Sequence, residues 1–339
     1  MPPADATSGQ AGEFRLIARH FTRAADQAAP VALGIGDDCA LLDAPDGRSS
    51  VQWAVTTDLL AEGMHFLPGT DPEALGHKAV AVNLSDLAAC GAAPHAFFLA
   101  LALPRADDAW VAAFARGLFA LADRYGCRLA GGDTTRTRAG VTVAITALGE
   151  VPRGAALLRS GARPGDDVWV SGVLGDGALG LAVRRGTVAL DAASVQPAVQ
   201  RLERPEPRVA LGLALRTVAS SAIDVSDGLA GDLGHVLARS DVAAALQWEA
   251  IPRSEALRSL SDTQQREYVL TGGDDYELLF TAPPTAAVAV RAAGAAAGVA
   301  VSRIGEIRPA TGGGARLALI DRDGRAMDIA PRAFDHFLP

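Results

Sequence analysis

Lysine, asparagine and cysteine are nearly absent from this sequence. Its 339 residues include one lysine, Lys78, and one asparagine, Asn83, while every other cation is arginine or histidine. The formal net charge is −8 and no basic run occurs, which argues against nucleic acid or an anionic membrane surface as the main partner. Apolar runs reach only about half the length of a membrane span. We therefore expect neither kind of partner.

The three cysteines, Cys39, Cys90 and Cys127, form no CxxC pair. This usage is typical of buried thiols in a reducing compartment, so we expect a cytoplasmic protein. Residues 1–12 lack the basic and apolar regions of a signal peptide, and we expect a flexible tail there. The phosphate-binding GxxxxGK[ST] loop, the GxGxxG fingerprint, GxSxG, HExxH and paired Cys/His metal ligands are all missing, which excludes the site types they mark.

Length and pattern indicate two α/β domains. Strands and helices alternate up to residue 150, with strands at 51–57, 95–104, 127–133 and 140–150 and helices at 13–21, 72–91 and 106–126. A stretch rich in Gly, Pro and Arg follows at 151–166, where we place the boundary. We thus expect an N-terminal domain over 13–150 and a C-terminal domain over 151–339.

The second half predicts strands at 167–172 and 222–227, helices at about 205–220 and 228–240, and a loop that enters a strand at 272–282. An Ala-rich helix at 285–300 and two strands close the chain. The fold class is therefore α/β, of the α+β type, in two units.

Aspartates recur at the expected ends of strands and helices, beside Gly, Ser or Thr. The set comprises Asp37, Asp38, Asp58, Asp86, Asp133, Asp224, Asp227, Asp274 and Asp275. Any one of them alone is typical of a turn or a cap. Together they supply hard oxygen ligands without His or Cys, which suits Mg²⁺ beside phosphate oxygens. A cluster of like charges also needs a cation, because each carboxylate raises the pKa of the others.

The segment "HKAVAVNLSD" (77–86) holds both rare residues and one of these aspartates. At 100° per residue, Lys78, Asn83, Ser85 and Asp86 share one arc of the expected helix. One interpretation is a solvated face. The other is a face that looks into the acidic cluster, with Asp86 as ligand, Asn83 orienting it and Lys78 offsetting charge.

In order along the chain, "GEFRLIARHF", "GIGDDCALL", "KAVAVNLSDLAACGA", "GGDTTR", "RSGARPGD", "AIDVSDGL" and "GGDDYELLF" resemble the thiamine-monophosphate kinase family from Gly12 to about Phe280. The resemblance implies ATP-dependent phosphorylation of thiamine monophosphate to thiamine diphosphate, the last step in making that cofactor. It also implies a fold like aminoimidazole ribonucleotide synthetase, with N-terminal domains that pair in a homodimer, and several Mg²⁺ ions.

Site residues carry over by position. The resemblance implies magnesium ligands at Asp38, Thr56, Thr57, Asp58, Asp86, Asp133, Asp224 and Asp227. It implies ATP contacts at Gly132, Asp133, Arg159 and Ser226. It implies substrate contacts at His65, Asp274 and Phe334. The helical arc, and not the resemblance, makes Lys78 and Asn83 the residues that would support the metal ligands. Asp274 stands where the family often has Glu, and Phe334 where Tyr or Trp can occur. No covalent nucleophile or general base is expected, because a phosphate oxygen of the substrate is already anionic.

Two alternatives stay open at this point. One is another ATP-using enzyme of the same superfamily, such as aminoimidazole ribonucleotide synthetase, selenophosphate synthetase or a hydrogenase maturation factor. The chain lacks the reactive Cys near an N-terminal Lys of the second and the cysteine tail of the third. The other alternative is a structural protein that binds Mg²⁺ or Ca²⁺ without catalysis.

Overall fold

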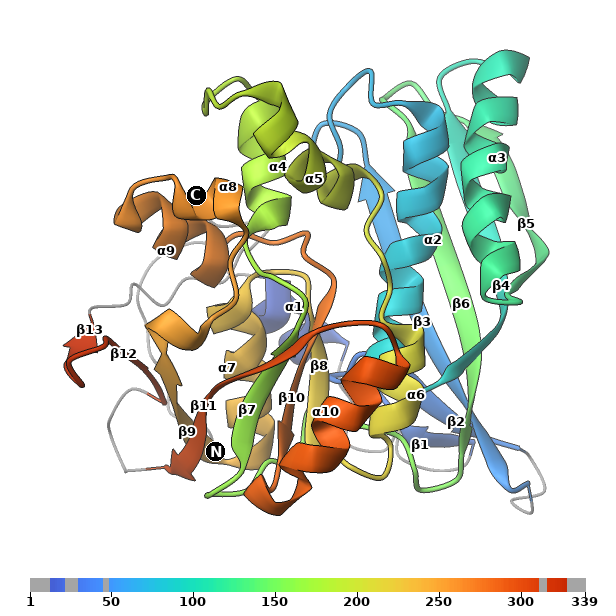
Figure 1. Ribbon diagram of the computed structural model, residues 1–339. Helices are drawn as coiled ribbons and strands as arrows, with labels where there is room; N and C mark the ends of the chain where they lie inside the picture. Colours follow the sequence, from blue (N-terminus) through green and yellow to red (C-terminus); the bar gives the residue numbers. More distant parts are fainter. Residues whose placement is uncertain (1–12, 22–29, 45–48, 311–315, 328–339) are drawn as a thin grey trace.

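The computed structural model describes residues 13–21, 30–44, 49–310 and 316–327, and two β-sheets with their helices organise these residues (Figure 1). The expected tail at 1–12 lies outside the described residues, and so does Phe334. Within the described ranges, no helix combines the length and the apolar character needed to cross a membrane.

The first sheet carries six strands within the described residues. Their order across the sheet is β1 (Val31–Leu33), β2 (Ala40–Asp43), β3 (Val51–Ala61), β6 (Thr142–Pro152), β4 (Ala93–Leu103) and β5 (Arg128–Arg136). Neighbouring strands are antiparallel except β4 and β5, which are parallel. Every second residue of β6 is buried, so the sheet has one covered face and one open face.

Helix α2 (Pro72–Ala89) packs on the covered face, and α3 (Asp108–Arg124) packs against α2. Asp71 caps α2, because its carboxylate accepts backbone N–H groups in the first turn. The two helices approach closely at Gly76, where a Cβ would lie 2.0 Å from the Phe114 carbonyl oxygen. Only glycine permits that spacing, which fixes α2 firmly against its neighbour.

The second sheet has seven strands within the described ranges. Their order is β13 (Ala326–Met327), β12 (Leu317–Ile320), β9 (Val242–Gln247), β11 (Val301–Pro309), β7 (Asp167–Ser171), β10 (Glu277–Ala282) and β8 (Ser221–Val225). Strands β7 and β10 and the edge strand β8 are buried along their whole length. This burial requires layers on both faces of the sheet.

Apart from α1 near the N-terminus, the remaining helices follow β7 in the chain. They are α1 (Glu13–His20), α4 (Asp176–Arg184), α5 (Ala192–Glu203), α6 (Val209–Leu215), α7 (Leu229–Ser240), α8 (Glu255–Arg258), α9 (Asp262–Leu270) and α10 (Ala287–Ala296), with single 3₁₀ turns at η1 (Trp248–Ala250) and η2 (Pro284–Ala286). Figure 1 shows α7 beside β8, and α10 beside α6.

Helix α2 is buried on nearly all sides. The first sheet covers one side of this helix, and the second unit, which consists of the second sheet and its helices, covers another side. Leu84 and Leu87 belong to a hydrophobic core that continues into the second unit through Leu211 and Phe280. Lys78 and Asn83 are buried as well. The interpretation of this polar arc as a solvated face is therefore wrong.

Several predicted elements differ from the structure in extent. Strand β3 runs to Ala61, four residues beyond the prediction, and the helix expected at 205–220 shrinks to α6. From the sequence we predicted none of helices α4, α5, α8 and α9 and none of strands β1, β2, β9 and β13. Helix α4 was missed because it starts in a glycine-rich stretch that is typical of a loop. Strand β6 ends at Pro152, two residues beyond the predicted boundary at residue 150, which stays a prediction.

Candidate active site

A cavity of about 1090 Å³ opens between the first sheet and the second unit. Its walls come from β3, α2, α4, the loop after β8, α9 and the loop before β10, with residues of α1 at one side. The acidic residues that line it are Glu13, Asp58, Asp86, Asp224, Asp227, Glu267 and Asp274. Segments distant in the sequence thus bring several of the predicted aspartates to one place.

Three carboxylates form the centre of this site. One oxygen from each of Asp38, Asp86 and Asp224 lies within 4.8 Å of the others. The three residues come from the loop before β2, from α2 and from β8. The prediction that these strand-end and helix-end aspartates gather is confirmed for this trio.

Hydroxyl groups hold two of the three carboxylates. Thr56 donates to Asp86 Oδ2 at 2.5 Å, and Ser85 donates to Asp224 Oδ2 at 2.6 Å. The Ser85 contact joins α2 to the second sheet. Ser85 was recognised on the polar arc of the helix but was not assigned a role from the sequence, because a serine inside a helix gives no signal of its partner.

Arg159 is the cation of this centre. Its Nε and Nη2 donate to Asp38 Oδ1 at 3.1 and 2.5 Å. The other oxygen, Asp38 Oδ2, is buried and has no hydrogen-bond partner among the described residues. A buried carboxylate oxygen without a partner is costly, so this atom marks a place where a cation would fit.

Burial and mutual repulsion disfavour the charged forms of these carboxylates. Burial, helped by the charge of Asp38, raises the pKa of Asp224 to about 8. Burial and the neighbouring Asp227 raise the pKa of Asp58 to about 6. Burial, with Asp58 and Asp224, holds the pKa of Asp86 well above its ordinary value. Protein groups alone therefore leave the negative charge of this site undercompensated.

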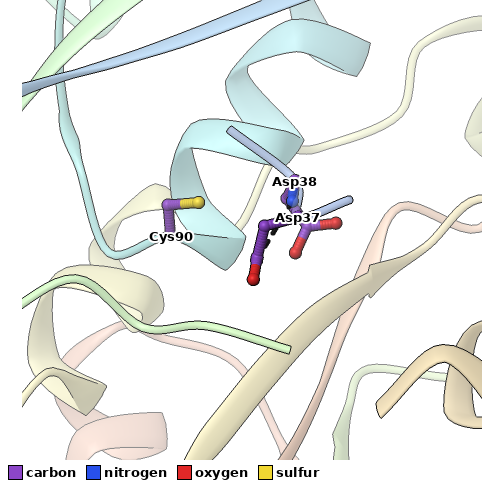
Figure 2. Close-up of side chains that lie close together, drawn as sticks. All are labelled: Asp37, Asp38 and Cys90. Carbon is purple, nitrogen blue, oxygen red and sulfur yellow. Dashed lines mark hydrogen bonds between the residues drawn. The ribbon is translucent and has the colours of Figure 1, made fainter. Parts of the chain in front are cut away.

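Asp37 is a further carboxylate next to Asp38, the residue it neighbours in the chain. Figure 2 shows Asp37 and Asp38 near Cys90, which follows α2, and one ligand atom from each of the three lies within 4.8 Å of the others. Both oxygens of Asp37 accept the backbone N–H of Arg159 at 3.2 Å. Burial raises the pKa of Asp37 to about 6. Asp37 belongs to the acidic pattern of the sequence but was not among the predicted ligands.

The polar arc of α2 faces the site through contacts that differ in part from those expected. Lys78 Nζ lies 2.7 Å from Asp274 Oδ1. Asn83 Oδ1 accepts the backbone N–H of Asp58 at 3.3 Å. The side-chain support that the sequence assigned to Asp86 thus goes to Asp274 and Asp58, and Asp86 receives its bond from Thr56 instead.

A turn after β8 presents Ser226 and Asp227 to the cavity. Asp232 Oδ2 fixes this turn by accepting the backbone N–H groups of both residues at 3.1 Å. Sequence reasoning missed Asp232, because "GLAGDLG" matches a helical pattern. On the opposite wall, Thr57 lies near Asp58, and its hydroxyl pairs with that of Thr146 at 2.9 Å.

Two predicted residues lie elsewhere. Gly132 and Asp133 belong to β5, an edge strand that is exposed along its length, and neither lines the cavity. In register, Asp133 pairs with Ala100, Ala100 with Ala144, and Ala144 with Leu59 of β3. At about 4.8 Å per strand this separation from β3 is about 14 Å along the sheet. Within one chain, Asp133 is therefore not part of the carboxylate centre.

Two of the predicted substrate residues line the cavity, namely His65 and Asp274. His65 Nδ1 accepts the backbone N–H of Ala61 at 3.0 Å. The Asp274 carboxylate accepts a hydrogen bond from the Tyr276 hydroxyl at 3.1 Å. Phe334 lies outside the described residues.

The donors at the centre fit a hard divalent cation. They are carboxylate and hydroxyl oxygens, which Mg²⁺ prefers, and no histidine lies in the trio. The orphaned oxygen of Asp38 and the raised carboxyl pKa values both indicate missing positive charge. The group of Asp38, Asp86 and Asp224 can therefore hold such an ion, with Thr56 beside it.

Known proteins resemble this chain over nearly its whole length. A family model described as "AIR synthase related protein, N-terminal domain" matches residues 36–151, and one described as "AIR synthase related protein, C-terminal domain" matches residues 163–318. The thiamine-monophosphate kinase of Escherichia coli K12 is 45% identical over 328 residues, which cover 96% of this chain and 98% of that protein.

Solved structures give the same result. The crystal structure of thiamine-monophosphate kinase from Stenotrophomonas maltophilia K279a is 45% identical, with a TM-score of 0.76 over 88% of this chain and 92% of that one. AaThiL complexed with AMPPCP and TMP is 30% identical, with a TM-score of 0.79 over 96% of this chain and 97% of that one.

Proposed function

This chain belongs to the thiamine-monophosphate kinase family, and we propose on that footing that it transfers the γ-phosphoryl group of ATP to the phosphate of thiamine monophosphate. The products are thiamine diphosphate and ADP. The observation that carries the proposal is the carboxylate trio of Asp38, Asp86 and Asp224, of which Asp86 and Asp224 line a large cavity between the two units.

The metal ligands we propose are those that the family pattern implies. Asp38, Asp86 and Asp224 would form the inner set, and the neighbouring donors would be Thr56, Thr57, Asp58 and Asp227. When bound, Mg²⁺ ions would screen the phosphates of ATP and substrate from one another and stabilise the charge that develops during transfer.

The nucleophile needs little activation by the protein. A phosphate oxygen of thiamine monophosphate carries negative charge at neutral pH, so we propose direct in-line transfer without a phosphoenzyme. The histidine environment fits this view. His65 uses Nδ1 to accept a backbone N–H, and burial lowers the pKa of His235 to about 4, so this ring is neutral at pH 7.

Arg159 and the turn after β8 would hold the phosphates of ATP. The guanidinium of Arg159 pairs with Asp38, and it becomes available to a phosphate when another cation compensates that carboxylate. Ser226 presents its hydroxyl at a turn that Asp232 keeps in one conformation. For the thiamine end we propose His65, Asp274 and Phe334 as contacts.

We further propose a homodimer, because Asp133 and Gly132 reach a carboxylate centre only if a second copy presents them. The sheet face on which Asp133 lies also carries two exposed apolar side chains, Leu59 (53% exposed) and Phe98 (45%). A second copy seated on this face would cover them and bring its own Asp133 toward the cavity.

A cytoplasmic location is also proposed. Its support is the state of Cys39, Cys90 and Cys127, which are buried and form no disulfide.

The test measures ADP release from ATP and Mg²⁺ with and without thiamine monophosphate, together with the thiamine diphosphate formed. We expect equal amounts of ADP and thiamine diphosphate. A rate of ATP consumption that does not depend on thiamine monophosphate would favour another enzyme of the superfamily. An absence of ATP consumption would favour a structural metal-binding protein.

Two variants test the ligand assignment in the same assay. Asp86→Asn and Asp133→Asn should each lose turnover while the protein stays folded by circular dichroism. Full activity in both variants would rule out the proposed metal site.

A further inference from the structure

Lys78, the chain's one lysine, is buried on α2 with 4% of its surface exposed. A buried ammonium group needs a specific partner, because leaving water costs several kcal/mol for an unpaired ion. That partner is Asp274 of the second unit, whose Oδ1 lies 2.7 Å from Lys78 Nζ. The ion pair thus crosses the interface on which the cavity opens.

The loop that carries Asp274 is held in an unusual conformation. Asp274 and Tyr276 have φ values of 67° and 50°, in the left-handed region that non-glycine residues seldom adopt. The backbone N–H of Asp274 donates to the Ser226 carbonyl at 2.9 Å, and that of Tyr276 donates to Val225 at 2.8 Å. These contacts fix the loop to the end of β8, beside the turn that bears Ser226.

The two oxygens of Asp274 have different surroundings. Oδ1 receives both Lys78 Nζ and the Tyr276 hydroxyl, at 2.7 and 3.1 Å. The carboxylate keeps 27% of its side-chain surface exposed and lines the 1090 Å³ cavity. Lys78 lines a separate cavity of about 430 Å³ instead. Lys78 therefore contacts Asp274 from outside the larger cavity.

We propose that Lys78 is a positioning residue for thiamine monophosphate, which acts by holding Asp274 so that its second oxygen faces the substrate. This inference rests on the proposed function. The thiazolium ring of thiamine is cationic and its aminopyrimidine has an N–H donor, and both suit a carboxylate. Lys78 fixes the rotamer of that carboxylate and offsets part of its charge, so the pocket is preorganised before substrate enters.

The first test is kinetic. Lys78→Met, Asp274→Asn and the double variant are assayed with each substrate varied in turn. Loss of a charge-assisted contact predicts that Lys78→Met raises the KM for thiamine monophosphate by about tenfold to a hundredfold. The KM for ATP should stay close to that of wild type. Because the two residues act as one unit, the double variant should be no worse than Asp274→Asn alone.

Arg124→Gln is the matched control. Arg124 forms another ion pair across the same interface, 2.6 Å from Glu206, and lines neither cavity. Its kinetic constants should equal those of wild type. A loss in Arg124→Gln as large as that in Lys78→Met would show that any interface ion pair matters equally, and would overturn the positioning role.

A second readout needs no turnover and no assignment, because ¹⁵N-lysine labelling gives a single side-chain signal. We expect Asp274→Asn to shift the Lys78 Nζ resonance, and thiamine monophosphate to shift it in wild type while AMPPCP alone does not. An unchanged Lys78 Nζ chemical shift in Asp274→Asn would overturn the inference, even if Lys78→Met fails to fold.

The outcomes separate the two proposals. A wild type without thiamine-monophosphate-dependent turnover would refute the proposed function. An active wild type whose Lys78→Met variant keeps its KM for thiamine monophosphate would refute the positioning role alone. Multiplicative losses in the double variant, with a raised KM for ATP, would assign Lys78 to a phosphate and also refute that role.

Discussion

Replacing Asp224 with asparagine should stabilise the metal-free protein while it destroys the proposed site. Asp224 is buried, and burial with the charge of Asp38 raises its pKa from 3.8 to about 8. The folded state therefore binds a proton that the unfolded state releases above pH 4. Since the folded pKa is the higher one, this contribution to stability is complete below pH 3.8 and is lost as the pH rises toward 8.

The magnitude follows from the gap between the two states. In the unfolded state the carboxyl is ionised at pH 7, which is about three pH units above its usual pKa. At about 1.4 kcal/mol per unit, the wild-type protein therefore loses about 4 kcal/mol of unfolding free energy between that pKa and pH 7. Asparagine has no such proton to take up, and its side-chain oxygen can still accept the hydrogen bond from Ser85. The gain in unfolding free energy should thus grow from near zero at pH 4 to about 4 kcal/mol at pH 7.

Urea unfolding in the presence of a chelator measures this difference at pH 4, 5.5 and 7. Addition of MgCl₂ should then stabilise wild type and leave Asp224→Asn almost unchanged. A variant that is no more stable than wild type at pH 7, or whose gain does not depend on pH, would refute the inference that the ionised Asp224 carboxylate destabilises the metal-free fold.

Three further outcomes follow from other contacts. The thermal midpoint of the metal-free wild type should fall as the pH rises from 4 to 8, because Asp37 and Asp58 have folded pKa values raised to about 6 and release protons more readily when unfolded, and the midpoint gained with Mg²⁺ should be larger at pH 8 than at pH 5. Asp275→Asn should cost about 1–3 kcal/mol in urea unfolding, since its two oxygens each accept one backbone N–H at the start of α4 and an amide can match only one of them. Gly76→Ala should lower stability by about 1–3 kcal/mol in the same assay, because its methyl group would lie 2.0 Å from the Phe114 carbonyl oxygen.

Local pattern placed Asp38, Asp86 and Asp224 among nine candidate aspartates, and the family resemblance, rather than the pattern, marked them as ligands. Asp38, Asp86 and Asp224 each follow an apolar or glycine-rich run beside small residues, which is how ligands at the ends of elements appear in a sequence. The same pattern did not separate Asp274 from Asp275. The backbone at Asp274 is left-handed, so the Asp274 carboxylate lines the cavity while that of Asp275 accepts backbone N–H groups at the start of α4. No residue type in the sequence predicts this conformation.

The remaining differences arise from contacts between distant segments. Helix α2 has two faces by periodicity, but both are buried, because the second unit covers the polar one. The partner of Lys78 could not be predicted for this reason, since Asp274 lies almost 200 positions further along the chain. The position of Asp133 depends on strand order, which places β5 at an edge of the sheet. Local sequence patterns do not predict strand order.

We propose that Asp38, Asp86 and Asp224 hold the divalent cations of a thiamine-monophosphate kinase. Crystals grown with Mn²⁺, AMPPCP and thiamine monophosphate test it most directly, because manganese gives an anomalous signal that magnesium does not. We predict anomalous peaks within ligand distance of carboxylate oxygens from all three residues, between them and the phosphates. Peaks only at other sites, with these three carboxylates free of metal, would contradict the account.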